Sequence, residues 1–517
     1  MNPLQCVHRF QDIASPISLI EYFRYIAQQE YAVLLDSGMD PCKLGRFSFA
    51  GRKPFLVFKS KGDRISIMHN GEVTYKQGNP FLQLRNLLSQ YRVDPACYGG
   101  RHIPFLGGAV GYFGYELCYH IEELPCHGVD DLGLPDCYFL FYDSILIYDH
   151  REKKLALSVI GFDVNGKVAE ENARQKLEEL HEEIRRIEHV ETYEPPAAIR
   201  HAISNEGNED RYANRNLDFR PMLTEEQYTD MVRKAGEHIA AGDVLEVCTT
   251  HRFECDFSGD AFELYQELRS INPAPFAAYL HLPEVKIVSS SPERFLQVGR
   301  DGWCMSRPIK GTRPRGATQQ QDRRLYDELL SSAKDRAEHV MIVDLVRNDF
   351  GRVCEKNSIQ VPELMIIEEY ATVFQMVSTI VGKLEKERDC LDLVQACFPG
   401  GSMTGAPKIK AMSIIDSLEP VKRGIYSGSI GYLDFAGSAD LNIVIRTILV
   451  KDGQAYFQVG GAVVADSDPK DEYLETLHKA RALIQALRNI RQRTAPAGRD
   501  AYGPIVKEHT GRPTRCL

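Results

Sequence analysis

Short apolar runs bounded by turn residues dominate the chain as far as about residue 165, and this pattern is typical of β-strands. The predicted strands are residues 31–35, 55–59, 64–68, 138–150 and 155–160. The second and third of these flank Gly62 and Asp63, which predicts a hairpin. The stretch 104–114 mixes glycine with aromatic residues, and glycine within a strand indicates that the backbone packs closely or bends there.

Helical periodicity appears at three places that bound the strand-rich regions. Residues 166–190 carry leucine and isoleucine at helical spacing among many charges and predict an amphipathic helix. Thr224 and Gln227 have the spacing of a capping box, which predicts the start of a helix that ends at Gly242. Another helix is predicted at 261–271, just before an Asn-Pro pair.

The second half of the chain groups its strands together, with helices between the groups and no regular strand–helix–strand repeat. The predicted strands are residues 244–257, 276–282, 285–290, 295–298, 427–433, 441–450 and 455–464. This order of elements predicts an α+β fold with largely antiparallel sheets.

Changes in composition predict four parts. Residues 1–190 form an N-terminal region, and residues 223–492 form a second region. Between them, residues 191–222 are polar and predict a linker or long surface loop. Residues 493–517 are basic, rich in proline and glycine, without apolar periodicity, and predict a mobile tail.

The composition excludes several classes of protein. With 62 Lys+Arg against 72 Asp+Glu, the net charge of −10 gives no general attraction to nucleic acid. No apolar run is long enough to span a bilayer, and the first residues do not resemble a signal or transit peptide. The 13 cysteines contain no C-x-x-C pair, which argues against a zinc site or a disulfide framework. We therefore expect a cytoplasmic protein with reduced thiols.

Two predicted helices, at 334–346 and 468–490, place acids on a face that also carries apolar residues. These residues are Asp335 and Glu338 on the first helix, and Glu472 and Glu475, with Lys479, on the second. A salt bridge to arginine is the commoner role for one buried acid. Four carboxylates without thiols or imidazoles suit a hard cation, so we expect Mg²⁺ and an anionic small molecule.

Residues 306–316, S-R-P-I-K-G-T-R-P-R-G, hold one lysine between a rigid proline and Gly311. A lysine beside apolar residues can become a nucleophile, so Lys310 is a candidate for covalent chemistry. Burial and the neighbouring cations Arg307 and Arg313 are expected to lower its pKa. The alternative is a solvated lysine in a basic turn.

Six motifs occur in order along the chain. They are S-P-E-R-F at 291–295, P-I-K-G-T-R-P-R at 308–315, E-H-V-M-I-V-D-L-V-R-N-D at 338–349, F-P-G-G-S-M-T-G-A-P-K at 398–408, Y-S-G-S-I-G-Y at 426–432 and E-T-L-H-K-A at 475–480. Together they resemble the chorismate-utilising enzymes: anthranilate synthase component I, aminodeoxychorismate synthase component I, and the isochorismate and salicylate synthases. The resemblance implies two large, mostly antiparallel sheets packed as a sandwich, with helices outside and the active site between the sheets.

The same resemblance implies roles for individual residues. Glu338 and Glu475 would bind Mg²⁺ directly at the ring carboxylate of chorismate, with Asp335 and Glu472 behind them. Glu293 matches the general acid/base at the leaving C4 hydroxyl. The residues implied to contact substrate are Gly311, Thr312, Ser402, Tyr426, Arg446, Gly460 and Lys479.

Lys310 distinguishes between members of the family. Anthranilate synthases usually have alanine at this position, whereas aminodeoxychorismate synthases typically read P-I-K-G-T, as this chain does. The resemblance implies that Lys310 attacks C2 of chorismate and expels the C4 hydroxyl. Ammonia then enters at C4 and gives 4-amino-4-deoxychorismate, for para-aminobenzoate and folate synthesis. An amine is a competent covalent nucleophile.

Three positions depart from the usual family pattern. Glu246 replaces the glutamine usual in the ammonia users; the water-using members have a lysine base there, so water is a poor candidate nucleophile here. Gln375 stands where many members have a histidine linked to pyruvate elimination, which fits an enzyme that stops at the amino-deoxy compound. Ala462 replaces a glycine of the carboxylate-binding loop.

The sequence contains no G-x-C-x-G glutaminase motif, so the resemblance implies a separate glutamine amidotransferase subunit that supplies ammonia. The main alternative function is anthranilate synthase component I in tryptophan biosynthesis, or an enzyme that serves both pathways. A further alternative is a non-catalytic regulator that binds tryptophan or chorismate through the L-L-D-S segment ending at Ser37. The acids on both helices argue against this last alternative, because a binding relic has no need of a metal site.

Overall fold

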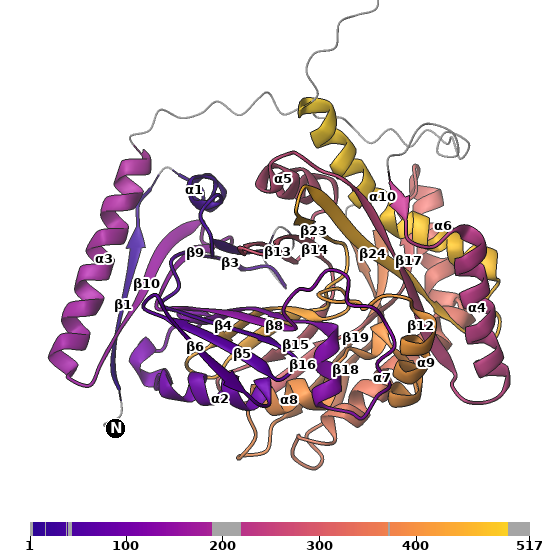
Figure 1. The fold of residues 1–517 in the computed structure, drawn as a ribbon, viewed down its shortest axis with the longest axis horizontal. Coiled ribbons are helices and arrows are strands. Elements are labelled where there is room, and N and C mark those ends of the chain that lie inside the picture. Colours follow the sequence, from indigo (N-terminus) through magenta and orange to yellow (C-terminus); the bar gives the residue numbers. More distant parts are fainter. Residues whose placement is uncertain are drawn as a thin grey trace, which may run out of the picture.

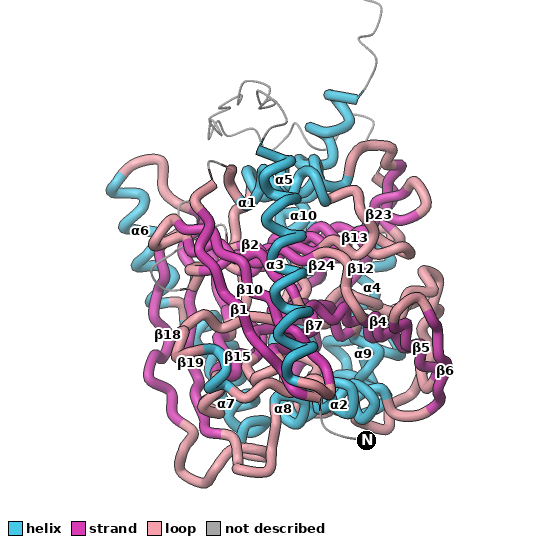
Figure 2. The backbone as a smooth tube through the Cα atoms, turned by 90° about the vertical axis from the view of Figure 1, so that its left-hand side faces the viewer, coloured by secondary structure: helices cyan, strands magenta, loops and turns pink. Residues whose placement is uncertain are grey.

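Two large antiparallel sheets lie one above the other in this computed structural model, with helices on their outer faces (Figure 1). The structure describes residues 4–15, 17–37, 39, 44–188, 219–370 and 373–494. Helices α1, α5 and α10 lie above the upper sheet, and α2, α7, α8 and α9 lie below the lower one, in both ribbon and tube views (Figure 2). The predicted α+β sandwich is therefore confirmed.

The upper sheet, here called the first sheet, contains 12 strands from the described residues. In order they are β1 (Gln5–Ile13), β10 (Lys154–Asp163), β9 (Ser144–Asp149), β3 (Phe47–Gly51), β2 (Val33–Asp36), β13 (Phe276–His281), β14 (Lys286–Ser291), β23 (Thr447–Lys451), β24 (Gln454–Val463), β12 (Glu246–Asp256) and β11 (Arg220–Pro221), with β20 (Gly405–Ala406) also paired to β12.

The second sheet also contains 12 strands from the described residues. In order they are β17 (Ile309–Pro314), β19 (Val373–Lys383), β16 (Trp303–Arg307), β15 (Arg294–Val298), β22 (Ala439–Asn442), β21 (Ser429–Asp434), β7 (Gly108–Phe113), β8 (Cys137–Tyr142), β4 (Leu56–Lys61), β5 (Arg64–His69) and β6 (Glu72–Gln77), with β18 (Gln360–Glu369) also paired to β19.

The helices cover the outer faces and the ends of the sheets. They are α1 (Leu19–Ile26), α2 (Pro80–Gln90), α3 (Gly166–Glu188), α4 (Glu225–Ala240), α5 (Ala261–Ile271), α6 (Gln319–Ser331), α7 (Ala333–Phe350), α8 (Cys390–Cys397), α9 (Lys408–Leu418) and α10 (Pro469–Thr494), together with the 3-10 turns η1 (Pro95–Tyr98), η2 (Tyr115–His120) and η4 (Gly401–Met403).

The largest apolar core joins the inner faces of the two sheets and extends to α2, α7 and α8 below the second sheet. Phe49 of the first sheet and Tyr432 of the second sheet meet there with ring centroids 5.7 Å apart in an edge-to-face contact. Phe105 stacks on the same tyrosine at 4.6 Å. A second core packs α1, α5 and α10 against the outer face of the first sheet. Burial of these apolar faces is the main stabilising term of the sandwich.

Local signals in the sequence predicted several elements correctly. The hairpin of β4 and β5 forms around Gly62, and the helix predicted at 261–271 is α5. Thr224 accepts a hydrogen bond from the backbone N–H of Gln227, and the glutamine side chain caps in return, as predicted for the start of α4. Asp468 caps the backbone N–H groups of Lys470 and Asp471 at the start of α10. Helices α1, α2, α6, α8 and α9 were missed.

Two predicted strands are each broken into two, and this prediction was wrong. The segment predicted as one strand at 138–150 contains β8 and β9, which lie in different sheets and separate at Asp143. The segment predicted at 441–450 likewise contains the end of β22 and all but the last residue of β23, again in different sheets. In both cases the chain crosses from the second sheet to the first, and the apolar residues on either side of the crossing made two strands resemble one in the sequence.

The N-terminal region and the second region share both sheets. Strand β2 pairs with β13 in the first sheet, and β7 pairs with β21 in the second. The division at 191–222 stays a prediction, since residues 189–218 lie outside the described part of the chain, as does most of the tail predicted at 493–517.

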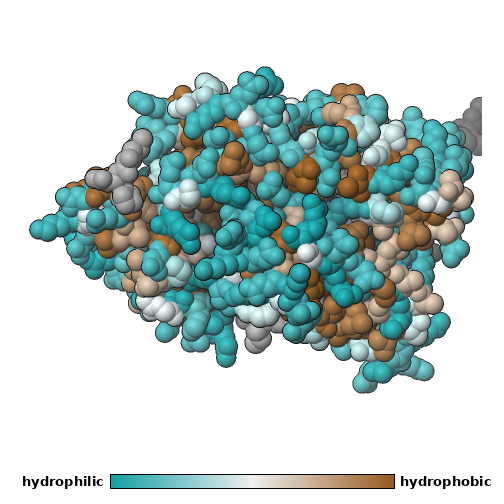
Figure 3. All heavy atoms as spheres, turned by 90° about the horizontal axis from the view of Figure 1, so that it is seen from below, coloured by the Kyte–Doolittle hydropathy of each residue, from teal (hydrophilic) through white to brown (hydrophobic). Residues whose placement is uncertain are grey.

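The outer face seen from below is mostly hydrophilic, with separate apolar patches (Figure 3). Among the described residues, no helix is long and apolar enough to cross a membrane.

A pair of glycine substitutions tests the packing of the second sheet. A Cβ atom on Gly111 would lie 1.8 Å from the carbonyl oxygen of Tyr138, so Gly111→Ala should lower the free energy of unfolding by about 1–3 kcal/mol or more. A Cβ atom on Gly236, inside α4, would meet nothing within 4 Å, so Gly236→Ala should raise it by about 1 kcal/mol. Denaturant unfolding measures both, and effects of the same sign would contradict this account.

Candidate active site

Lys310 lies in the space between the two sheets. It extends from β17 of the second sheet and donates a hydrogen bond to Oε1 of Glu246, on β12 of the first sheet, at 2.8 Å. The lysine side chain is 11% exposed and the glutamate is 0% exposed. The nucleophile candidate is therefore held in a buried ion pair that joins the sheets.

The predicted lowering of the pKa of Lys310 is wrong. Burial acts to lower this pKa, but the charge of Glu246, the hydrogen bond to it, and the charge of Glu338 outweigh burial and raise it. The arginines expected to lower it are paired elsewhere: Arg307 with Glu363 and Glu368, and Arg313 with Glu328 and Asp335. Lys310 is a protonated amine at rest.

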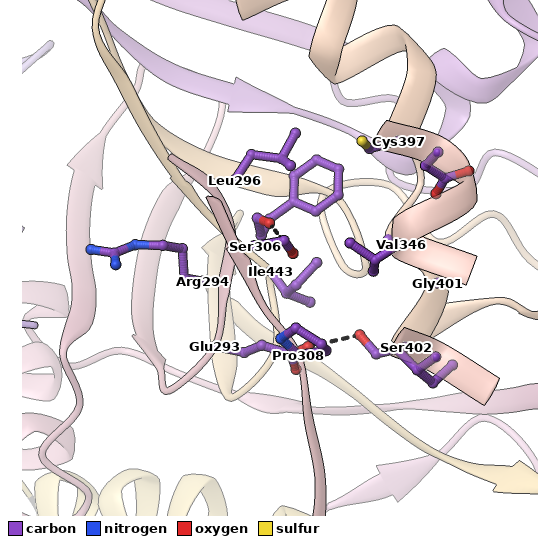
Figure 4. Close-up of a pocket in the computed structure, with 14 residues that line it drawn as sticks. Glu293, Arg294, Leu296, Ser306, Pro308, Val346, Cys397, Gly401, Ser402 and Ile443 are labelled. Atoms are coloured by element: carbon purple, nitrogen blue, oxygen red, sulfur yellow. Dashed lines mark hydrogen bonds between the residues drawn. The ribbon is translucent and has the colours of Figure 1, made fainter. Parts of the chain in front are cut away.

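Glu293 is a buried carboxylic acid at the edge of a small cavity (Figure 4). Ser402, on the 3-10 turn η4, donates a hydrogen bond to its Oε1 at 2.9 Å. Burial raises the pKa of Glu293 to about 7, against the smaller lowering effects of Ser402, a backbone N–H and Lys310. The cavity of about 20 Å³ has room for one water molecule. Glu293 can therefore exchange a proton near neutral pH.

The acids predicted on two helices face one region. Lys334 of α7 lies 4.0 Å from Glu338, and its charge also acts on Glu472 and Glu475 of α10. Burial raises the pKa of Glu338 to about 7, and burial also raises that of Glu472. For Glu475 burial acts in the same direction, but Lys479 outweighs it and the pKa is lowered.

These acids offer oxygens that fit a hard cation. Oε1 of Glu338 and Oε2 of Glu472 are buried without a hydrogen-bond partner. Glu475 is half exposed, and its Oε1 lies 2.6 Å from Nζ of Lys479. Within the described ranges, no three acids, histidines or cysteines lie close enough to hold a metal by themselves. Mg²⁺ commonly binds one or two carboxylates and completes its shell with ligand oxygens and water, so the residues present fit it.

The predicted carboxylate-binding residues are also brought together. Arg446 donates a hydrogen bond to the backbone oxygen of Lys479, and Nζ of Lys479 donates to the backbone oxygen of Gly460 at 2.8 Å. Arg446 lies in the crossing between β22 and β23 with φ of 53°, not in a strand as predicted. Burial lowers the pKa of Arg446 and raises that of Tyr426.

Other predicted residues lie at the rim or away from this region. Gly311 has φ of 80°, and a Cβ atom there would lie 3.1 Å from Oδ1 of Asp335, whereas the Thr312 side chain is exposed. Gln375 is the cross-strand partner of Thr312, and Ala462 is that of Cys248. Ser37 lies beyond β2, where its hydroxyl donates to the backbone oxygen of Pro275 at 3.3 Å.

Sequence reasoning missed two buried polar groups near the site. His339 follows Glu338 on α7 and bonds Ser378 at 2.6 Å; burial, then Lys310, lowers its pKa to about 4. Arg423 donates to both oxygens of Glu419 and to the backbone oxygen of Cys248. The arginine precedes the Y-S-G-S motif by three residues, and this proximity was the only available signal.

Comparisons with known proteins show the family of this chain. A family model described as chorismate binding enzyme matches residues 49–485. The chain belongs to this family and is a chorismate-utilising enzyme.

Similar relatives carry two different names. Anthranilate synthase component 1 of Acetivibrio thermocellus is 38% identical over 485 residues, covering 92% of this chain and 94% of the relative. Aminodeoxychorismate synthase component 1 of Bacillus subtilis (strain 168) is 39% identical over 472 residues, covering 91% and 94%. The crystal structure of anthranilate synthase component I from Streptococcus pneumoniae TIGR4 is 30% identical with a TM-score of 0.71, covering 90% of this chain and 97% of that one.

Replacement of Glu293 by glutamine tests the burial of its carboxyl group. Its pKa of about 7 lies above the ordinary 4.5, so stability is complete below the ordinary value and is lost as pH rises towards 7. Glu293→Gln should therefore gain stability relative to the native chain across this window, by about 2–3 kcal/mol at its upper end.

Denaturant unfolding on both sides of that window measures the difference. Glu152→Gln, at an exposed turn, is the matched control and should show no trend with pH. A stability difference for Glu293→Gln that stays constant with pH would contradict the burial argument.

Proposed function

We propose that this chain aminates chorismate at C4 and gives 4-amino-4-deoxychorismate with the enolpyruvyl group retained, as component I of an aminodeoxychorismate synthase. The product would serve para-aminobenzoate and folate synthesis. The observation that carries the proposal is the place of Lys310: its amine lies in the inter-sheet space, 2.8 Å from Glu246, and its charge acts on Glu293. An enclosed amine beside a proton donor is suited to covalent catalysis.

In this proposal Lys310 attacks C2 of the ring while the C4 hydroxyl leaves. Glu293, with a pKa of about 7, gives the leaving oxygen a proton, so that water departs. The hydrogen bond from Ser402 holds the Glu293 carboxyl in place. Ammonia then forms the new bond at C4 and the lysine nitrogen leaves, which regenerates the enzyme.

The substrate carboxylates would be bound by Tyr426, Arg446, Lys479 and the backbone near Gly460. The guanidinium of Arg446 donates a hydrogen bond to the backbone oxygen of Lys479, and the amine of Lys479 donates one to the backbone oxygen of Gly460, so both cations are oriented before substrate arrives. Pre-orientation of this kind lowers the entropy that binding must overcome.

Glu338 and Glu475 would hold Mg²⁺, with Asp335 and Glu472 behind them. When bound, the ion would offset the repulsion between these acids and the anionic substrate.

Ammonia would come from a partner glutamine amidotransferase subunit. Relatives of this chain carry the names of a first component, which supports a second one. The absence of a G-x-C-x-G motif from the sequence supports the same proposal.

Anthranilate synthase component I is the second candidate. The relative with that name from Acetivibrio thermocellus is as similar, at 38% identity over 485 residues. In that case the product would be anthranilate with release of pyruvate, and Lys310 would have no covalent role.

Mass spectrometry of the intact protein distinguishes these candidates. With chorismate present and ammonia withheld, the native chain should gain the mass of chorismate less one water, and Lys310→Ala should abolish this adduct. With ammonia added, the released product should be 4-amino-4-deoxychorismate. Lys451→Ala, which removes a surface lysine paired with Asp452, is the control and should keep the adduct. Release of pyruvate and fluorescent anthranilate by the native chain would instead establish the second candidate.

Removal of one acid on either helix tests the metal proposal. Glu338→Gln and Glu475→Gln should each reduce chorismate turnover to near background without loss of circular dichroism. Mg²⁺ titration by calorimetry in the presence of chorismate should show binding to the native chain only. Glu328→Gln, an exposed partner of Arg313, is the control. Full turnover in the presence of EDTA would overturn the proposal.

A further inference from the structure

Glu246 has one oxygen on Lys310 and one oxygen without a partner. Oε1 accepts the hydrogen bond from Nζ at 2.8 Å, and Oε2 is buried with no hydrogen-bond partner. The side chain is 0% exposed. A carboxylate placed only to hold a cation would ordinarily have both oxygens satisfied.

The surrounding cations do not compete for Glu246. Arg307 and Arg313, the nearest in sequence to Lys310, bind other acids. Among the described residues, the amine of Lys310 is therefore the one side-chain donor that forms a hydrogen bond with the Glu246 carboxylate.

The charged and titratable groups around the pair come from several elements. Those that act electrostatically on Lys310, or on which it acts, are Cys248 of β12, Glu293 at the β14–β15 crossing, Glu338 and His339 of α7, and Glu475 of α10. Of the groups named here, Glu246 is the one in hydrogen-bond contact with Nζ.

We propose that Glu246 is the base that removes the proton of Lys310 and so produces the neutral amine that attacks the substrate. The inference rests on the proposed covalent role of Lys310 and adds the source of its activation. Geometry supports it, because Oε1 of Glu246 lies 2.8 Å from Nζ, within the distance over which a proton passes directly from donor to acceptor.

Protons and bonds balance along this route. A proton passes from Nζ to Oε1, and the freed lone pair forms the N–C bond as the C4–O bond breaks and Glu293 protonates the departing hydroxyl. Ammonia next forms its bond at C4, and the lysine leaves as a neutral amine. The new ammonium group returns a proton to Glu293, and Glu246 returns its proton to Lys310.

A glutamine at position 246 tests the role of proton transfer without changing the shape of the side chain. Glu246→Gln keeps the size and a hydrogen-bonding oxygen but cannot accept a proton from Lys310. The lysine of this variant must lose its proton to solvent, so its reaction rate should depend on pH in a way that the native rate does not.

The experiment follows formation of the Lys310 adduct with chorismate, without ammonia, by rapid quench and intact-protein mass spectrometry. The ratio of native to variant rates cancels the ionisation of Glu293, which both proteins share. We expect the ratio of native to variant rate to fall by about tenfold for each unit by which the pH rises, from about pH 6 up to the pKa of Lys310 in the variant. Glu363→Gln, which removes a carboxylate paired with Arg307, is the matched control, and its ratio should not change with pH.

The outcomes separate this inference from the proposed function. If the native chain forms no adduct, the covalent role of Lys310 fails and the inference fails with it. If the native chain forms the adduct but the ratio for Glu246→Gln stays constant with pH, only the role of Glu246 is overturned. Glu246→Asp keeps an ionisable group at shorter reach, so its adduct should form more slowly with a ratio independent of pH. A pH-dependent ratio for the aspartate variant would also overturn the inference, including where the glutamine variant does not fold.

Discussion

The ion pair between Lys310 and Glu246 is the interaction on which the site depends. It joins β17 of the second sheet to β12 of the first at 2.8 Å, in a place where neither side chain is well solvated. Removal of one partner would leave an uncompensated buried charge, which typically costs about 3–5 kcal/mol. The two sheets must therefore hold their spacing and register for the amine to sit where it does, and the large apolar core between them provides that rigidity.

The crossings between the sheets place the other polar groups of the site. Glu293 lies where the chain passes from β14 to β15, and Arg446 lies where it passes from β22 to β23. Backbone hydrogen bonds join the two crossings. The N–H of Ile443 donates to the backbone oxygen of Glu293 at 3.0 Å, and the N–H of Ser290 donates to the backbone oxygen of Arg446 at 3.1 Å. Residues at a crossing face the space between the sheets without belonging to either, so a rigid scaffold can present irregular backbone to a ligand.

Different environments divide the carboxyl groups of this region by protonation. Burial raises the pKa of Glu293 to about 7, whereas Lys479 outweighs burial at Glu475 and lowers its pKa. A site that contains both a protonatable acid and a persistent carboxylate can give a proton in one place and bind cations in another. In this fold the difference follows from position: Glu293 is enclosed by both sheets, and Glu475 lies half exposed on α10.

The sequence by itself determined many of the local elements and most of the candidate residues of the site. Capping residues and hydrophobic periodicity act over a few residues, so they are readable without the fold. The paired acids of α7 and α10 were visible for the same reason.

Only the tertiary structure decided where the apolar runs at 138–150 and 441–450 break, because the sheet that a strand joins depends on partners far away in the chain. It also decided the charge of Lys310. The neighbouring arginines suggested a lowered pKa, but the group that contacts the amine is Glu246, 64 residues distant in sequence, and electrostatic energies follow distance in space.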